Sequence, residues 1–350
     1  MSNFVIAETP VLIASQIEQL SHEIKSTFHE YQRLFILMDE NTQQYCYPIF
    51  STIISSHIKL IPIVVPAGES SKNLTVAENC WKQLFDHAAT KNDILISLGG
   101  GVVSDLAGFV AALYKRGMQF YSFPTTLMAM TDAALGGKTG IDYLNFKNSI
   151  GVFNSPLKIF IATEFLNSLS NREYENGLAE IYKHAIIQDS SMWNELKNAN
   201  DIFEILQKSI AVKAKVVNND YHEKGERKIL NFGHTIGHAL ESDALANNID
   251  MLHGEAVVVG MIIESELAFQ LGVLSEKDKM EIVEVLKNKF TPDFNLKFDF
   301  DQLAEYMKQD KKNTAEISFS LPTAIGSCGY NYVASLEMIN KAMQIYYRFK

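Results

Sequence analysis

Three histidines and their spacing are the strongest sign of chemistry in this sequence. Residues 227–238 read RKILNFGHTIGH, and residues 252–255 read LHGE. Positions four apart share one face of a helix, so His234 and His238 can point into the same cavity, with His253 following after a loop. Imidazole nitrogens suit zinc, so the pattern predicts a divalent-metal site. The alternative is that both are core histidines without a metal, on a helix that contains glycine, because HxxxH is a short and common pattern.

Length, composition and charge narrow the classes of protein to consider. The chain has 350 residues, of which 47% are hydrophobic, enough for one large or two medium domains. No apolar run reaches membrane-spanning length, residues 1–10 lack the pattern of a secretory signal, and three separated cysteines fit a reducing cytoplasm. The net charge of −10 argues against nucleic acid or an anionic membrane as partner. It still allows an anionic small substrate where basic residues converge.

Short apolar runs rich in β-branched and aromatic residues alternate with helical patterns in the first half of the chain. This alternation predicts an α/β domain with a parallel sheet covered on both faces. In such folds a ligand lies beyond the carboxyl ends of the strands. A helix is expected over residues 74–89. The predicted strands are residues 34–38, 61–65, 94–98, 120–123 and 159–162.

A glycine-rich turn follows the third predicted strand, where Gly99, Gly100 and Gly101 precede a predicted helix. Glycines here let the backbone approach a pyrophosphate and bring it to the positive end of the helix. The order is not GxGxxG, and a turn that only packs tightly is the alternative. Asp39 follows the first predicted strand, where a carboxylate can accept hydrogen bonds from ribose hydroxyls. Together these features indicate a nucleotide site without the standard motif.

A second glycine-rich turn contains Gly137, Lys138 and Thr139, which resemble the end of a phosphate-binding P-loop. The complete P-loop pattern needs glycine at the position that Asp132 occupies, so that interpretation fails. A lysine on such a turn still suits a phosphate or a sugar oxygen.

From about residue 173 the pattern becomes helical, which places a domain boundary near residues 163–172. In the first of these helices Glu180, Lys183 and His184 lie at i, i+3 and i+4 and share one face. An exposed Glu–Lys pair is the simpler interpretation of that spacing. The predicted helices are residues 174–188, 202–219, 227–240, 254–271 and 336–349.

Taken together, these stretches resemble the 3-dehydroquinate synthase family, sugar phosphate cyclases of the shikimate pathway of aromatic amino acid biosynthesis. The resemblance runs from about residue 35 to about residue 330. It implies a Rossmann-like NAD-binding α/β domain over 1–165 and an all-helical metal- and substrate-binding domain over 166–350. The active site would lie in the cleft between them, and the protein would be a homodimer. The motifs are, in order, GGGVVSD, KRG, FPTTL, DAALGGK, KN, GLAEIYK, VKAKVV, RKILNFGHTIGHA, LHGE and DKKN.

The resemblance also implies a role for individual residues. The metal, Zn²⁺ with Co²⁺ as a possible substitute, would be held by Glu180, His234 and His253, so that His238 would contact substrate instead. The late lysine of the substrate set is Lys311 or Lys312. The substrate-binding and catalytic residues would be Arg116, Asp132, Lys138, Asn148, Lys183, Lys213, Arg227, Asn231, His238 and Lys311. The NAD contacts would be Asp39, Asn41, Glu69, Lys72, Gly100, Gly101, Asp105, Thr125, Thr126, Lys147, Phe165 and Ser168.

The implied reaction converts 3-deoxy-D-arabino-heptulosonate 7-phosphate to 3-dehydroquinate and phosphate. It combines transient oxidation by NAD⁺, elimination of phosphate, re-reduction, ring opening and intramolecular aldol closure. A substrate that carries a carboxylate and a phosphate explains why so many basic residues would converge. NAD would be recycled within one turnover, which makes the enzyme a lyase without net redox change.

Some positions depart from the family's usual pattern, and other functions remain alternatives. Ser104 stands in place of a usual glycine, Ser168 of a threonine, Ser170 of a proline and Tyr221 of an acidic residue. A related cyclase that makes valiolone or scyllo-inosose would change the substrate-binding set. A metal-dependent polyol or glycerol dehydrogenase would release NADH. A catalytically inactive binding subunit would have no need of an intact set of metal ligands.

Overall fold

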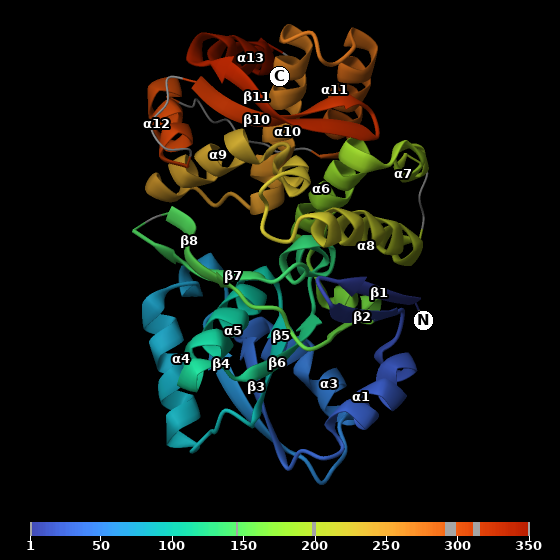
Figure 1. Ribbon diagram of the computed structural model, residues 1–350, viewed down its shortest axis with the longest axis vertical. Helices are drawn as coiled ribbons and strands as arrows, with labels where there is room; N and C mark the ends of the chain where they lie inside the picture. The colour runs from blue at the N-terminus through green and yellow to red at the C-terminus, as the bar shows by residue number, and fades with distance from the viewer. Residues whose placement is uncertain (1, 145, 198–200, 291–298, 311–315, 349–350) are drawn as a thin grey trace. The chain divides into compact units, whose positions relative to one another are not determined.

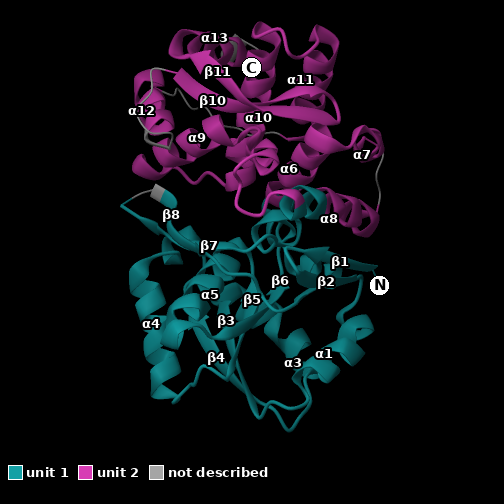
Figure 2. Cartoon of the chain, in the orientation of Figure 1, with its two compact units in different colours: residues 1–174, 213–218 teal, residues 175–212, 219–350 magenta. Residues whose placement is uncertain are grey.

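The computed structural model describes residues 2–144, 146–197, 201–290, 299–310 and 316–348 (Figure 1). The chain forms two compact units. Unit 1 comprises residues 1–174 and 213–218, and unit 2 comprises residues 175–212 and 219–350 (Figure 2). Within the described ranges, no helix is both long enough and apolar enough to cross a membrane.

Unit 1 is built on a seven-stranded sheet in the order β1-β2-β9-β6-β5-β3-β4. All neighbouring strands are parallel except the antiparallel pair β1–β2. The predicted strands and the α/β class are confirmed. The strands are β1 (Ser2–Ile6), β2 (Thr9–Ala14), β3 (Arg33–Asp39), β4 (Lys59–Val65), β5 (Ile94–Gly99), β6 (Gln119–Pro124) and β9 (Ile159–Ala162).

The β1–β2 hairpin was not predicted, because its turn carries no glycine, proline or asparagine. Ala7 and Glu8 join the strands with φ values of +49° and +68°. A two-residue hairpin turn needs positive φ, a conformation that is sterically unfavourable for most residues other than glycine. The sequence signal that usually marks such a turn is therefore missing here.

Helices cover both faces of the sheet, as the alternation of side chains along β6 requires. Phe120 packs into the core formed with α4 (Leu74–Asp86) and α5 (Gly101–Leu113). Tyr121 and Phe123 point the other way, and their rings contact Phe28 of α1 (Ser21–Phe28). The ring of Phe123 also contacts Phe50 of α3 (Tyr47–Ile53), and a short helix α2 (Glu40–Tyr45) follows β3.

A β-hairpin, β7 (Lys138–Tyr143) with β8 (Phe146–Phe153), lies against α5 in unit 1. Gly108 of α5 permits this contact, since a Cβ there would lie 2.2 Å from Thr139 Cγ2. The hairpin carries Lys138, Lys147 and Asn148, all of them predicted site residues.

Unit 2 is helical, as expected, but it is not all-helical. One antiparallel hairpin, β10 (Glu316–Ala324) with β11 (Ser327–Ser335), contacts α10. The helices, of which α6 and α8 also contribute residues 171–174 and 213–218 to unit 1, are α6 (Asn171–Gln188), α7 (Ser190–Leu196), α8 (Ile202–Asn219), α9 (His234–Ala246), α10 (His253–Gln270), α11 (Glu276–Lys289), α12 (Phe300–Asp310) and α13 (Leu336–Arg348).

The single helix predicted over 227–240 is wrong. Residues Glu226–Asn231 form a 3₁₀ helix, η6, and α9 starts afresh at His234. Gly233 breaks the helix with φ +81°, a conformation that favours glycine. A Cβ on this residue would lie 2.6 Å from Met261 Cγ, so the packing also requires glycine. The break makes His234 the first residue of its helix.

Candidate active site

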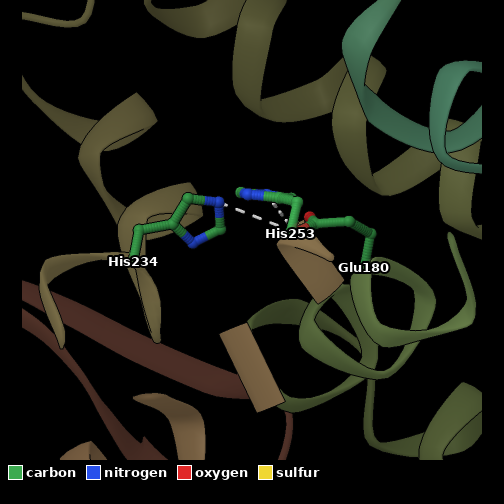
Figure 3. A group of neighbouring side chains, drawn as sticks. All are labelled: Glu180, His234 and His253. Atoms are coloured by element: carbon green, nitrogen blue, oxygen red, sulfur yellow. Dashed lines mark ion pairs between the residues drawn. The ribbon is translucent and has the colours of Figure 1, made fainter. Parts of the chain in front are cut away.

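Three potential metal ligands converge within unit 2 from three different helices. Glu180 lies in the middle of α6, whereas His234 and His253 are the first residues of α9 and α10. Their functional groups point toward one another (Figure 3). The Nε2 atom of each histidine lies 3.6 Å from Glu180 Oε1.

The spacing of these donors suits zinc. Zinc bonds to nitrogen and oxygen of about 2.0–2.2 Å in a tetrahedron put the donors roughly 3.4 Å apart. One carboxylate and two imidazoles leave coordination positions open, as catalytic rather than structural zinc sites do. Glu180 and His234 are almost shielded from solvent, with side chains 0% and 11% exposed. Residues that fit a catalytic divalent metal are thus present.

Both histidines have a further contact that fixes which ring nitrogen faces the cluster. His253 Nδ1 lies 3.1 Å from Glu241 Oε2, and His234 Nδ1 lies 3.1 Å from the carbonyl oxygen of Phe232. When Nδ1–H donates to these oxygens, Nε2 is left as the metal-binding lone pair. Glu241 was not predicted as a site residue, although it lies one turn after His238 on the same helix.

The same surroundings shift the pKa values of the two histidines in opposite directions. Burial lowers the pKa of His253, but the carboxylates of Glu241 and Glu180 outweigh burial and raise it to about 10. Burial, together with the Lys183 ammonium, holds the pKa of His234 well below its usual value despite Glu180. The lowered pKa favours the neutral imidazole of His234, the form that binds a metal, whereas His253 has to lose a proton from Nε2 before that nitrogen can bind one.

His238 lies beside this cluster rather than within it. Its ring packs against that of His234, with centroids 5.2 Å apart, but the group of close donor atoms around Glu180 contains His234 and His253 and not His238. His238, Glu241 and His253 form a second group whose donor atoms also lie close together. Because His253 Nδ1 pairs with Glu241, the two groups would use different nitrogens of the same ring.

Other predicted site residues of unit 2 are buried and held by defined contacts. Lys183, with a side chain 1% exposed, forms an ion pair with Glu180. Arg227 Nη1 donates to the carbonyl oxygen of Tyr221 at 2.5 Å. Because this contact uses only the main chain of Tyr221, the departure from an acidic residue leaves it intact. Lys311 and Lys312 lie outside the described residues.

A loop carboxylate orders the segment that carries Arg227. Asp220 accepts hydrogen bonds from the backbone amides of Lys224, Gly225 and Arg227. Burial alone would raise its pKa, but these donors hold it below the usual value. On the next turn, Asn231 Nδ2 donates to Glu223 Oε1 at 2.6 Å. Neither acidic residue was predicted to be part of the site.

In unit 1, predicted nucleotide and substrate residues gather around Lys72. This lysine is 4% exposed, and its ammonium lies 2.5 Å from Asp105 Oδ2 and contacts the side chain of Asn148. Nearby, Lys147 pairs with Glu69 at 3.3 Å. The cluster thus joins the η2 turn (Glu69–Ser71), α5 and the β7–β8 hairpin.

A second pair in unit 1 joins residues that are distant in the sequence. Lys213, near the middle of α8, forms an ion pair with Asp132, and both were predicted as substrate-binding residues. Arg116 and Lys138, in contrast, are exposed, and Arg116 has a positive φ of +67°. Exposed basic side chains of this kind can be reached by an anion.

The glycine-rich turn ends β5, and Gly100 is the N-cap of α5. A Cβ on Gly100 would lie 2.9 Å from Thr126 Cγ2, so tight packing contributes to the choice of glycine here. Ser104, in the next turn of α5, is buried, and its hydroxyl has no hydrogen-bond partner among the described residues.

The remaining candidates for NAD contacts lie in unit 1 with varied exposure. Asp39 caps α2 by accepting from the backbone amide of Thr42 at 2.7 Å. Phe165 is buried, and Ser168 Oγ donates to its carbonyl oxygen at 3.1 Å. Asn41 is exposed, whereas Thr125 is buried at the end of β6.

Comparison with known proteins supports one family across nearly the whole chain. The family described as 3-dehydroquinate synthase N-terminal matches residues 62–176, and the one described as 3-dehydroquinate synthase C-terminal matches residues 177–313. The 3-dehydroquinate synthase of Parabacteroides distasonis is 36% identical over 97% of this chain and 98% of its own. That of Campylobacter concisus is 40% identical over 76% of this chain and 78% of its own.

Solved structures share the fold at lower identity. The 2-epi-5-epi-valiolone synthase of Streptomyces hygroscopicus, solved with NAD⁺ and Zn²⁺ bound, superposes with a TM-score of 0.87 at 22% identity, covering 100% of this chain and 99% of its own. A protein from Sinorhizobium meliloti described as a probable glycerol dehydrogenase superposes with a TM-score of 0.65 at 14% identity, covering 96% of this chain and 95% of its own. From the family matches and the curated relatives, the chain belongs to the 3-dehydroquinate synthase family.

Proposed function

We propose that this protein converts 3-deoxy-D-arabino-heptulosonate 7-phosphate to 3-dehydroquinate and phosphate with NAD⁺ and a divalent metal, Zn²⁺ by preference. The observation that carries the proposal is the convergence of Glu180, His234 and His253 at a spacing suited to zinc. Relatives that are 36–40% identical over most of the chain are named 3-dehydroquinate synthase, the enzyme of this reaction. The solved 2-epi-5-epi-valiolone synthase structure, at 22% identity, supports the fold alone.

The metal would be held by Glu180 and by the Nε2 atoms of His234 and His253. Bound there, a divalent ion supplies Lewis acidity that lowers the pKa of a substrate hydroxyl. Lys183 forms an ion pair with Glu180 in a place almost closed to solvent, where electrostatic interactions are strong. His238, on the neighbouring turn of α9, is positioned to donate to or accept from a substrate oxygen.

The nucleotide would bind unit 1 at the carboxyl end of the parallel sheet. Bound NAD⁺ supplies an acceptor that takes a hydride and returns it within one turnover. The amino end of α5 offers backbone N–H groups to a pyrophosphate, and its glycines keep the approach open. Asp39 has one carboxylate oxygen engaged with Thr42, which leaves the other to accept from a ribose hydroxyl.

Basic residues would bind the anionic groups of the substrate. Two of them are held by acidic partners, Lys213 by Asp132 and Lys183 by Glu180. Arginine donates several fixed N–H groups and therefore suits the phosphate or the carboxylate. The substrate set would comprise Arg116, Asp132, Lys138, Asn148, Lys183, Lys213, Arg227, Asn231 and His238, with Lys311 from outside the described residues.

The test is an assay of the purified protein with the heptulosonate 7-phosphate, Zn²⁺ and catalytic NAD⁺. We expect stoichiometric release of phosphate and formation of dehydroquinate without build-up of NADH absorbance. NADH that accumulates with a polyol would mean a dehydrogenase. Turnover of sedoheptulose 7-phosphate alone would mean a related cyclase. Sedimentation of the same preparation would test the homodimer that the family resemblance implies.

A further inference from the structure

A buried carboxylate on α10 holds the start of the helix that carries His234. Glu264 has no exposed surface. Its Oε2 accepts a hydrogen bond from the backbone amide of Gly233 at 2.6 Å, and its Oε1 accepts from that of Ile236 at 3.1 Å. The first amides of a helix have no acceptor within the helix and need one from elsewhere. Gly233, the N-cap of α9, has no side chain to provide it.

We propose that Glu264 is a positioning residue for His234, one of the ligands in the proposed metal site. Its two oxygens accept hydrogen bonds from backbone amides on both sides of His234, at positions 233 and 236. Gly233 has no side chain that would restrict its backbone, since glycine adopts positive and negative φ with similar ease. Fixing its amide therefore fixes where the His234 side chain leaves the backbone. The inference rests on the metal site proposed above.

The geometry of α10 explains how one helix can align both histidines. Gly260 lies seven residues after His253, and Glu264 lies eleven residues after it, which is close to two and three full helical turns. They therefore share one face of α10. Gly260 lets the peptide of Gly233 lie against that face, because a Cβ there would be 2.0 Å from Gly233 O. His253 starts the helix, and the carboxylate of Glu264 positions His234 from the same surface.

The cost of burying a carboxylate supports a specific role rather than incidental packing. An isolated buried charge is strongly unfavourable, whereas one that accepts charge-assisted bonds from backbone amides is stabilised. The positive end of α9 adds to that stabilisation. The start of α10 is held in a similar way. Asn176 of α6 accepts a hydrogen bond at its Oδ1 from the backbone amide of Gly254 at 2.6 Å, next to His253. Both histidines thus begin helices whose first amides are held by a buried side chain from another helix.

The test compares Glu264→Gln with Glu266→Gln, a matched change on the same helix. Glu266 is also buried, but it lies on another face and pairs with Lys279 at 3.1 Å. In E264Q, the NH₂ group of the new amide would oppose one of the two backbone N–H groups. We expect E264Q to bind Co²⁺ about tenfold to a hundredfold more weakly than the wild type and to change the visible absorption of the bound ion. E266Q should bind Co²⁺ as the wild type does, even if it unfolds at a lower temperature.

Several outcomes would decide against the proposal. A folded E264Q with wild-type Co²⁺ affinity and absorption overturns the positioning role and leaves the metal site standing. A wild-type protein that binds no Co²⁺, or a His234→Ala variant that binds it normally, overturns the metal site and the role of Glu264 together. If E264Q does not fold, Glu264→Asp replaces it. That variant keeps the charge but withdraws the carboxylate by one methylene, and an unchanged Co²⁺ affinity would again refute the role.

Discussion

Burial beside the Lys72 cluster of unit 1 shifts the pKa of one carboxyl group, that of Asp142. Asp142 Oδ1 accepts from the backbone amide of Asn148 at 2.7 Å, and its own amide donates to Lys72 O at 2.7 Å. Burial raises the pKa of Asp142 to about 6, although Lys72 and the Asn148 amide oppose the shift. The folded chain therefore holds a proton on this carboxyl more tightly than the unfolded chain, whose value is 3.8.

Replacing Asp142 by asparagine should change how stability depends on pH. The native pKa lies above the unfolded value, so the contribution of Asp142 is fully present below about pH 4 and is lost as pH rises through about 6. Asparagine cannot ionise and avoids that loss. Between pH 4 and pH 7, the free energy of unfolding of D142N should rise relative to that of the wild type by on the order of 1–3 kcal/mol. Urea unfolding at both pH values measures this, and a difference independent of pH would contradict it.

Among the elements, the contact between α9 and α10 determines where both histidines lie. The two helices approach closely through glycines on facing surfaces, Gly237 on α9 and Gly260 on α10. Their demands differ. A Cβ on Gly260 would lie 2.0 Å from Gly233 O, whereas one on Gly237 would meet its nearest neighbours at 3.4 Å, an ordinary contact.

Alanine at these two glycines should therefore have opposite effects. Gly260→Ala has to push α9 away and should lower the free energy of unfolding by on the order of 3 kcal/mol. Gly237→Ala should be neutral or should stabilise by up to about 1 kcal/mol, because alanine favours a helix interior over glycine. Denaturant unfolding of both variants without added metal gives the comparison. Equal losses would mean that backbone approach is not the determinant.

At the scale of the molecule, each compact unit contains the groups expected for one ligand. Unit 1 has the parallel sheet and the glycine-rich turn at the start of α5. Unit 2 has the carboxylate and the imidazoles on α6, α9 and α10. A ligand that binds only the folded form of a unit slows opening of the segments that it contacts. Hydrogen exchange of backbone amides can therefore show which unit binds which ligand.

Hydrogen exchange with each ligand alone should separate the two units. NAD⁺ should slow exchange of amides near residues 99–106, and Zn²⁺ should slow exchange near residues 233–238 and 253–257. Mass spectrometry of peptides from these ranges, with ligand-free protein as reference, makes the measurement. Protection by Zn²⁺ confined to unit 1, or protection of 99–106 by Zn²⁺ but not NAD⁺, would contradict the assignment of ligands to domains.

Much of the fold was predictable because its signals are local. The parallel strands β3–β6 and β9 are short runs of mostly apolar residues, since helices cover both faces of the sheet, and α8 was predicted at its observed bounds, residues 202–219. The hairpins β1–β2, β7–β8 and β10–β11 were not predicted, because strand pairing depends on distant contacts and turns such as Ala7–Glu8 lack the usual residues. The histidine helix was extended too far for a similar reason, since the packing of Met261 against Gly233 enforces the break.

The sequence by itself determined the class of the fold, the family and the set of residues from which a site could be built. Those properties depend on periodicity, on residue type and on the order of motifs along the chain. The resemblance implied which residues would form the metal site, and the tertiary structure shows how three helices bring His234 and His253 to within 3.6 Å of Glu180. The physical reason is that convergence of side chains depends on how helices pack. Here that packing is governed by Gly260 and Glu264, neither of which carries a signal of function in the sequence.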